Sequence, residues 1–93
     1  MAGAREKRAR EIQAAIREVL YQEWDPLELR GVAPRDEYDS YIGGVYRILA
    51  SSRSDEALVQ FLGRTTADLG LAERGADHMR SVARRLLALD VRL

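Results

Sequence analysis

The chain has 93 residues with 15 basic and 15 acidic side chains, so its formal net charge is zero. Hydrophobic residues make up 46% and charged residues 32%, which predicts one globular domain over residues 1–93 and is too apolar for a disordered chain. Zero net charge excludes a general electrostatic attraction to nucleic acid or anionic lipid. The absence of cysteine excludes disulfides, thiolate catalysis and cysteine-ligated zinc.

The N-terminal residues are charged where a secretory signal would be apolar. No apolar run reaches the roughly 20 residues that span a bilayer. We therefore expect neither export nor membrane insertion, and a cytoplasmic location.

Hydrophobic periodicity predicts an all-α fold, a compact bundle of about four helices, because no segment alternates as a strand would. The first helix is expected from Ala4 to Tyr21 or Gln22, with residues 1–10 open to fraying. Its buried stripe recurs at helical spacing and comprises Ile12, Ile16, Val19 and Leu20.

A short extra helical turn is expected directly after the first helix. Asp25 suits the N-cap, Pro26 the first helical position and Glu28 the returning carboxylate of a capping box. Gly31 would end this turn. Trp24, just before it, is expected to fill the core rather than to lie on the surface.

The second full helix is expected to begin between Pro34 and Asp36 and to end in the loop at residues 51–54. Its inward stripe carries Tyr38, Tyr41, Ile42, Val45, Ile48 and Leu49. Gly43 and Gly44 lie inside this helix, where glycine costs about 1 kcal/mol relative to alanine. Their presence indicates a close contact with another helix or with a partner.

A third helix is expected after Ser54 as N-cap, with Leu58, Phe61 and Leu62 inward and Gly70 as a stop. The last helix is expected from Glu73 or Ala76 to Asp90. Its wide apolar face comprises Met79, Val82, Ala83, Leu86, Leu87 and Leu89.

The sequence lacks the usual signs of catalysis. His78 is the only histidine, and no serine stands in a nucleophile-elbow context. No glycine-rich phosphate-binding motif occurs, so no nucleotide or other cofactor is predicted. We expect His78 to be a surface or boundary residue without a chemical role, and the protein not to be an enzyme.

The segment from Glu18 to Asp39 is the acidic part of the chain, with seven acids against two arginines. Asp36, Glu37 and Asp39 could bind a hard cation, but they lack the spacing of a calcium loop, so no metal site is predicted. They could instead stabilise a helix N-terminus. The additional nearby acids favour a third interpretation, in which this surface recognises a basic partner.

Tyrosines stand beside these acids, and tyrosine is favoured both at interfaces and in cores. Tyr41 is expected mainly in the core, whereas Tyr38 fits either role. The candidate partner-binding residues are Glu23, Asp25, Glu28, Asp36, Glu37, Tyr38, Asp39 and Tyr41.

Trp24-Asp25-Pro26-Leu27 and Asp36-Glu37-Tyr38-Asp39-Ser40-Tyr41 resemble the W-D-P and D-E-Y-D-x-Y motifs of a family of small bacterial helical proteins. The resemblance extends from about Ile12 to Leu71. Leu69 stands where that family has methionine, and Glu28-Leu29 replaces its commoner glycine-aliphatic pair. The resemblance implies an immunity protein of a toxin–immunity locus, which binds and silences a protein toxin.

Two classes of function follow. In the first, the acidic surface docks on the basic active-site cleft of a toxin, a nuclease for example, and occludes it. The alternative is a small protein that binds nucleic acid or forms a homodimer through the helix that carries Gly43-Gly44. The basic residues available for nucleic acid are Arg5, Lys7, Arg8, Arg10, Arg80, Arg84 and Arg85. The oligomeric state stays open.

Overall fold

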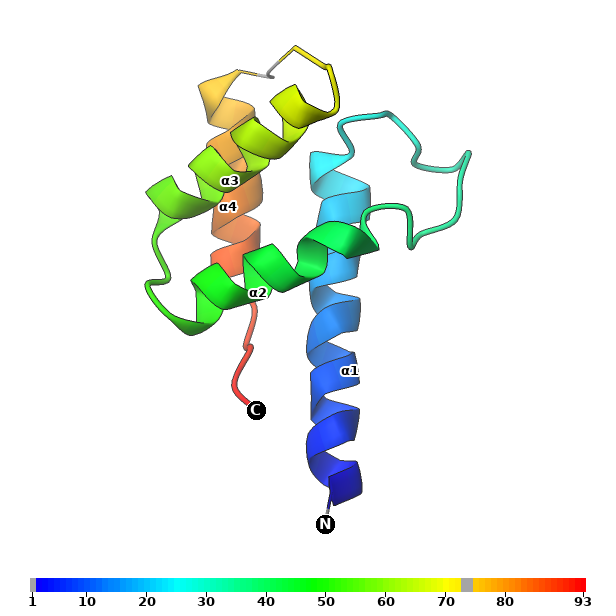
Figure 1. Ribbon diagram of the computed structural model, residues 1–93, viewed down its shortest axis with the longest axis vertical. Coiled ribbons are helices and arrows are strands. Elements are labelled where there is room, and N and C mark those ends of the chain that lie inside the picture. Colours follow the sequence, from blue (N-terminus) through cyan, green and yellow to red (C-terminus); the bar gives the residue numbers. More distant parts are fainter. Residues whose placement is uncertain (1, 73–74) are drawn as a thin grey trace.

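The computed structural model describes residues 2–72 and 75–93. Its helices are α1 (Ala2–Val19), α2 (Ile42–Ala50), α3 (Asp55–Asp68) and α4 (Ala76–Leu87). A π-helical turn at Leu20–Trp24 follows α1, and a 3₁₀ turn at Asp39–Tyr41 precedes α2. This part of the chain contains no strand. The predicted all-α bundle of about four helices is confirmed (Figure 1).

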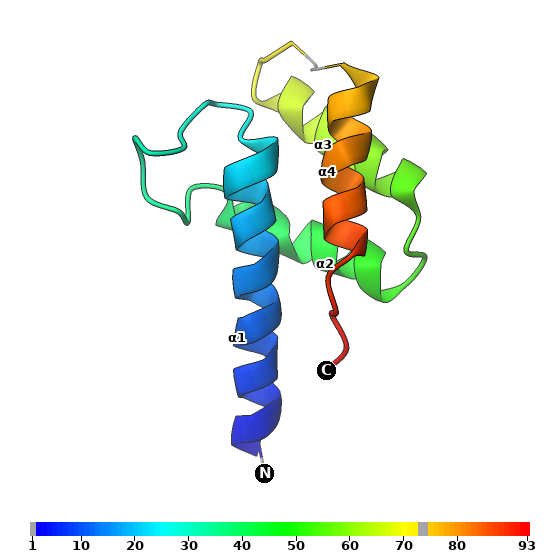
Figure 2. The ribbon, with the colours of Figure 1, turned by 180° about the vertical axis from the view of Figure 1, so that it is seen from behind.

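The helices α2, α3 and α4 gather beside the C-terminal half of α1, whose N-terminal half extends beyond them (Figure 2). α3 packs most extensively on α4, and α1 contacts both α2 and α4. The core lies between them and draws on every helix. Its buried hydrophobic members include Ile12, Ile16, Leu20, Trp24, Val45, Leu49, Leu58, Leu62, Met79, Val82 and Leu86. The predicted core placement of Trp24 is confirmed, since 1% of it is exposed.

The first helical segment ends two residues later than the latest predicted end, at Trp24. The Asp25 amide donates to the Leu20 carbonyl oxygen at 2.9 Å, which closes the π-helical turn. Asp25 then turns the chain with φ of 35°. Asp25 therefore ends a helical segment, and the prediction that it begins one is wrong.

The extra helical turn predicted at Pro26–Gly31 is absent, and residues 26–38 form successive turns instead. Glu28 has φ of 56° and Gly31 φ of 80°, values that a right-handed helix cannot accommodate. The second helix also begins later than predicted, at Ile42 rather than at Pro34–Asp36. Hydrogen bonds made by the hydroxyls of Tyr21 and Tyr38 hold this segment in its non-helical form.

The two glycines of α2 have different surroundings. A Cβ atom at Gly44 would collide with the ring of Phe61 on α3, so this glycine permits the close packing of the two helices. That part of the prediction is confirmed. A Cβ atom at Gly43 would meet no atom within 4 Å.

The boundaries of α3 follow local signals. The Ser54 hydroxyl accepts a hydrogen bond from the Ala57 amide at 3.1 Å, which confirms the predicted N-cap. Gly70 has φ of 77°, and the amides of Gly70 and Leu71 donate to the carbonyl oxygens of Ala67 and Thr66. This pair of bonds is a Schellman motif, and it confirms Gly70 as the stop.

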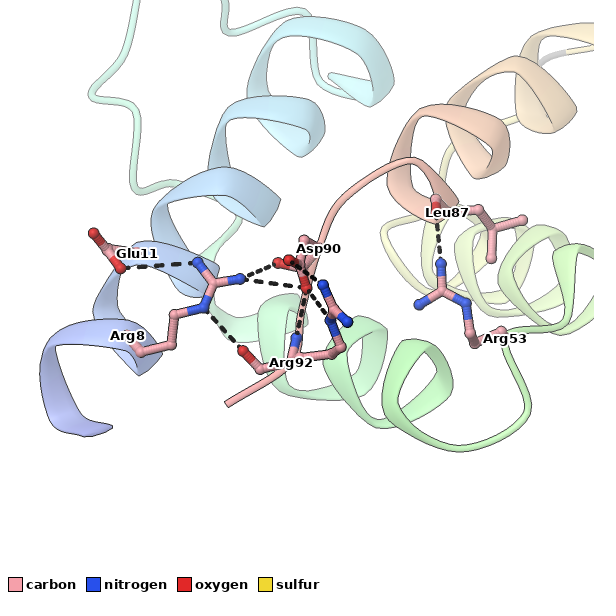
Figure 3. A network of polar contacts seen from close by, with 6 residues as sticks. All are labelled: Arg8, Glu11, Arg53, Leu87, Asp90 and Arg92. Atoms are coloured by element: carbon pink, nitrogen blue, oxygen red, sulfur yellow. Dashed lines mark hydrogen bonds and ion pairs between the residues drawn. The ribbon is translucent and has the colours of Figure 1, made fainter. Parts of the chain in front are cut away.

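The last helix begins at Ala76, and the alternative start at Glu73 lies outside the described residues. It ends at Leu87, three residues before the predicted Asp90. The guanidinium of Arg53 donates to the Leu87 carbonyl oxygen at 2.6 Å and satisfies that end of the helix (Figure 3). Beyond it the chain turns away, and Val91 is buried.

Arg8 of α1 holds the C-terminal segment 88–93 in place. Its Nε donates to the carbonyl oxygen of Arg92 at 2.9 Å and its Nη2 to that of Asp90 at 2.7 Å (Figure 3). The Asp90 carboxylate accepts hydrogen bonds from the side chain and amide of Arg92, which lower the pKa of Asp90. Segments 82 to 84 residues apart in sequence are thereby joined.

Candidate functional site

Asp25 and Tyr38, one from each sequence motif, bond to each other at the base of the loop formed by residues 25–38. The Tyr38 hydroxyl donates to Oδ1 of Asp25 at 2.7 Å and accepts from the Leu27 amide at 3.1 Å. The Asp25 carboxylate also accepts from the amides of Leu29 at 2.7 Å and Arg30 at 3.1 Å. These bonds satisfy backbone groups that have no helical partner, and they fix both ends of the loop.

Partial burial of the Asp25 carboxylate raises its pKa, but the hydrogen bonds from Tyr38 and from the two backbone amides lower it further. The pKa of Asp25 therefore lies below its ordinary value, and the group is ionised at neutral pH.

Tyr21 holds the middle of the 25–38 loop through hydrogen bonds to its backbone. Its hydroxyl donates toward two carbonyl oxygens, that of Ala33 at 2.7 Å and that of Leu29 at 3.1 Å. It accepts from the Gly31 amide at 2.8 Å. All three partners are backbone atoms, so one buried side chain of the first helical segment shapes the path of the loop.

The aromatic candidates pack inward. Trp24 lies against Tyr38 with ring centroids 5.3 Å apart, and against Tyr41 edge-on with centroids 5.6 Å apart. Tyr38 is 2% exposed and Tyr41 half-buried. The two tyrosines therefore belong to the core and its margin, and their rings are not displayed as interface anchors.

Two acidic candidates form ion pairs with other helices. Asp39 accepts from the Arg17 guanidinium through both carboxylate oxygens, at 2.9 and 2.8 Å, which joins the 3₁₀ turn to α1. This bidentate bond raises the pKa of Arg17. Glu23 lies 3.5 Å from the Arg85 guanidinium on α4. Asp39 and Glu23 thus stabilise contacts within the chain.

Glu28, Asp36 and Glu37 are exposed on the 25–38 loop. Two apolar side chains are displayed with them, namely Val32, which is 84% exposed, and Leu27, which is 42% exposed. The sequence interpretation missed both apolar residues. The sequence offers no signal that separates them from Leu29, an aliphatic residue of the same segment that packs against the core.

A polar pocket of about 400 Å³ brings three of the candidate acids together. Its walls are Gln22, Glu23, Asp25, Glu28, Arg30 and His78. Nε2 of His78 is buried without a hydrogen-bond partner among the described residues, a detail that the sequence does not reveal. The walls carry no hydroxyl or thiol that could act as a nucleophile, and their charge favours a basic group as occupant.

Within residues 2–72 and 75–93, no three histidine, cysteine or acidic side chains gather as a metal ion would require. No helix of this described part is long and apolar enough to cross a membrane.

The arginines considered for nucleic acid are partly paired. Arg80 lies 3.9 Å from Asp77, Arg85 contacts Glu23, and Arg8 binds the C-terminal segment.

Comparison of the whole chain with protein-family models, with curated proteins and with solved structures finds no match.

Proposed function

We propose that this protein acts by binding another protein, and that the 25–38 loop docks on a basic surface of that partner. The proposal is supported by one observation: hydrogen bonds hold the backbone of the loop in place, while several of its side chains are exposed to solvent. Asp25, Tyr38 and Tyr21 hold the backbone, while Val32, Asp36 and Glu37 point into solvent. A loop ordered before binding loses little conformational entropy when it binds.

The displayed side chains suit different tasks at an interface. Val32 and Leu27 supply apolar area that a partner can bury, which contributes to the lifetime of the complex. Asp36 and Glu37 supply exposed negative charge, which accelerates association with a basic surface at low ionic strength. The rings of Tyr38 and Tyr41, both partner-binding candidates from the sequence, pack against Trp24 instead.

The partner that we propose is a bacterial toxin with a basic active-site cleft, a nuclease for example. This step rests on the resemblance of the two motifs to proteins of toxin–immunity loci. Occupation of the cleft by the acidic loop would block the substrate without any chemical reaction by this protein.

The test begins with co-purification of the tagged protein and its partner from cells of its own organism. The purified partner is then measured against Asp36→Asn/Glu37→Gln and against Val32→Asp. We expect the first variant to slow association several-fold at low salt and the second to raise the dissociation rate. The matched control, Glu6→Gln/Asp68→Asn, removes two exposed charges outside the loop and should bind normally.

Asp39 is excluded from these variants, because its replacement would leave Arg17 without its bidentate partner and disturb α1. Loss of the same binding in the control variant, or undiminished binding by both loop variants, would contradict the proposal.

A further inference from the structure

Residues 2–10 of α1, which we call the basic arm, project beyond the other helices (Figure 2). Positions 3–7 and 10 are exposed. A Cβ atom at Gly3 would meet no atom within 4 Å. The only apolar side chains of the arm are those of three alanines. Burial of apolar surface therefore does not explain why α1 extends this far.

The basic arm concentrates positive charge in a chain whose formal net charge is zero. It has four basic residues and one acid, Glu6, hence a local net charge of +3. Arg8 is engaged, since its guanidinium donates to carbonyl oxygens of the C-terminal segment. The side chains of Arg5, Lys7 and Arg10 form no ion pair or hydrogen bond within the described part of the chain. These three cations are therefore available to an anionic partner.

The stability of α1 does not explain these charges. The first turn of the helix has no acid, although acids stabilise a helix N-terminus and cations there oppose the macrodipole. Glu6 and Arg10 have the favourable i, i+4 spacing, yet no ion pair joins them. A local pattern that weakens a free helix without a gain inside the chain indicates a role in binding.

The available cations lie on more than one side of the helix. At about 100° per residue, Lys7 and Arg10 lie about 60° apart, whereas Arg5 lies about 140–160° from both. A bilayer would meet one side only, and the arm has no large apolar side chain to insert into it. The major groove of B-form DNA, about 12 Å wide, admits a helix and has a phosphate backbone on each side. The narrow major groove of duplex RNA does not admit one.

We infer that the basic arm enters the major groove of duplex DNA, where Arg5, Lys7 and Arg10 bind phosphates of both strands without reading the base sequence. The 25–38 loop lies toward the opposite end of the molecule (Figure 1), so the inference does not depend on the proposed function. With only three phosphate contacts, the complex is expected to be weak at high salt and to strengthen steeply as the salt concentration falls.

The probe is a fluorescently labelled DNA duplex of about 20 base pairs, whose anisotropy is measured with the full chain over about 20–150 mM monovalent salt. Three phosphate contacts predict a slope of about −3 for log K against log salt. The variant Arg5→Gln/Lys7→Gln/Arg10→Gln should bind at least about tenfold more weakly at the lowest salt, with a slope near zero. Glu6→Gln should bind several-fold more tightly, because it removes the acid of the arm.

The matched control is Arg47→Gln/Arg64→Gln/Arg84→Gln, which removes three exposed cations, one each from α2, α3 and α4. It lowers the net charge by the same amount and should bind DNA like the wild type. Circular dichroism verifies that the arm variant keeps its helices. Arg5→Lys/Arg10→Lys retains the charge of the arm and should retain binding, which separates loss of charge from loss of structure.

Three results would overturn the inference. The first is the absence of binding at the lowest salt, or equal weakening by the arm variant and by the control. The second is equal competition by a duplex RNA of the same sequence, which would exclude the major groove. The third is self-association of the chain, lost in the arm variant and without DNA binding, which would assign the arm to the acidic loop of a second copy.

Discussion

The Tyr38 hydroxyl donates a 2.7 Å hydrogen bond to Oδ1 of Asp25, which joins two motifs that lie 13 residues apart in sequence. The residues between the two motifs, 26–37, form turns and no helix. The bond ties the buried Tyr38 to the carboxylate of Asp25, the residue whose backbone amide closes the first helical segment.

Replacement Tyr38→Phe should destabilise the protein by about 1–3 kcal/mol, because it leaves the Leu27 amide and one oxygen of Asp25 without this partner. Urea denaturation measures the loss. Tyr41→Phe is the matched control, since the Tyr41 hydroxyl makes no hydrogen bond among the described residues. Equal stabilities of the two variants would contradict a structural role for the Tyr38 hydroxyl.

At position 28, glycine should give a more stable protein than alanine. Both substitutions remove the same side chain, so their difference isolates the backbone conformation, which has φ of 56°. Glu28→Gly should be more stable than Glu28→Ala by about 1 kcal/mol, because only glycine adopts this conformation without steric cost. Thermal denaturation of both proteins decides the matter. An advantage for alanine, the usual order in helices, would contradict the left-handed conformation.

The stabilising effect of Asp25 should depend on pH. Its pKa is lower in the folded protein than in the unfolded chain, so its contribution is fully present above the unfolded pKa of about 4. The contribution is lost as the pH falls through the lower folded value. The difference in unfolding free energy between the wild type and Asp25→Asn should therefore be constant from about pH 7 to pH 5 and shrink below about pH 4. A difference that grows in acid would contradict this sign.

Substitution by alanine should change the stability of the protein differently at the two adjacent glycines of α2. Gly44→Ala should cost about 1–3 kcal/mol, since the added methyl group displaces the ring of Phe61. Gly43→Ala should be neutral or stabilise by up to about 1 kcal/mol, because its methyl group meets open space in a helix. Combining Gly44→Ala with Phe61→Leu should recover part of the loss. Similar effects at both positions would contradict the packing described for α2 and α3.

Replacement Arg8→Gln should release the C-terminal segment without unfolding the helices. The lost bonds go to the carbonyl oxygens of Asp90 and Arg92, and both lie at the surface. Hydrogen exchange at the amides of Val91 and Arg92 should accelerate, while the denaturation midpoint changes little. Arg10→Gln, at an exposed position of the same helix, is the control. Unchanged exchange in Arg8→Gln would show that burial of Val91 alone holds the segment.

The sequence predicts those parts of the fold that depend on local signals. The Ser54 cap, the Gly70 stop and the apolar stripe through Ile12 and Ile16 each act within a few residues, and the structure has them as predicted. Asp25-Pro26-Leu27-Glu28 is also a good local signal for a helix start. It fails because Asp25 bonds to Tyr38, which the local pattern does not include.

The candidate site was predictable in composition but not in arrangement. The acids are evident from the sequence, whereas their partners lie far along the chain, as in the pairing of Arg17 with Asp39 and of Glu23 with Arg85. Only the folded bundle separates acids that stabilise the chain from acids that face solvent. The same holds for the tyrosines, whose burial depends on Trp24.

The way in which Tyr21 holds the 25–38 loop has a consequence for how such a protein can change over evolution. The Tyr21 hydroxyl bonds only to main-chain atoms of Leu29, Gly31 and Ala33, so the bonds do not depend on the side chains at Leu29 and Ala33. Exposed positions such as Val32 and Glu37 can therefore accept new residues while the scaffold is retained. Exchange of these exposed side chains leaves the bonds from Tyr21 intact, so a foreign sequence can be grafted at these positions without loss of the bonds that hold the loop.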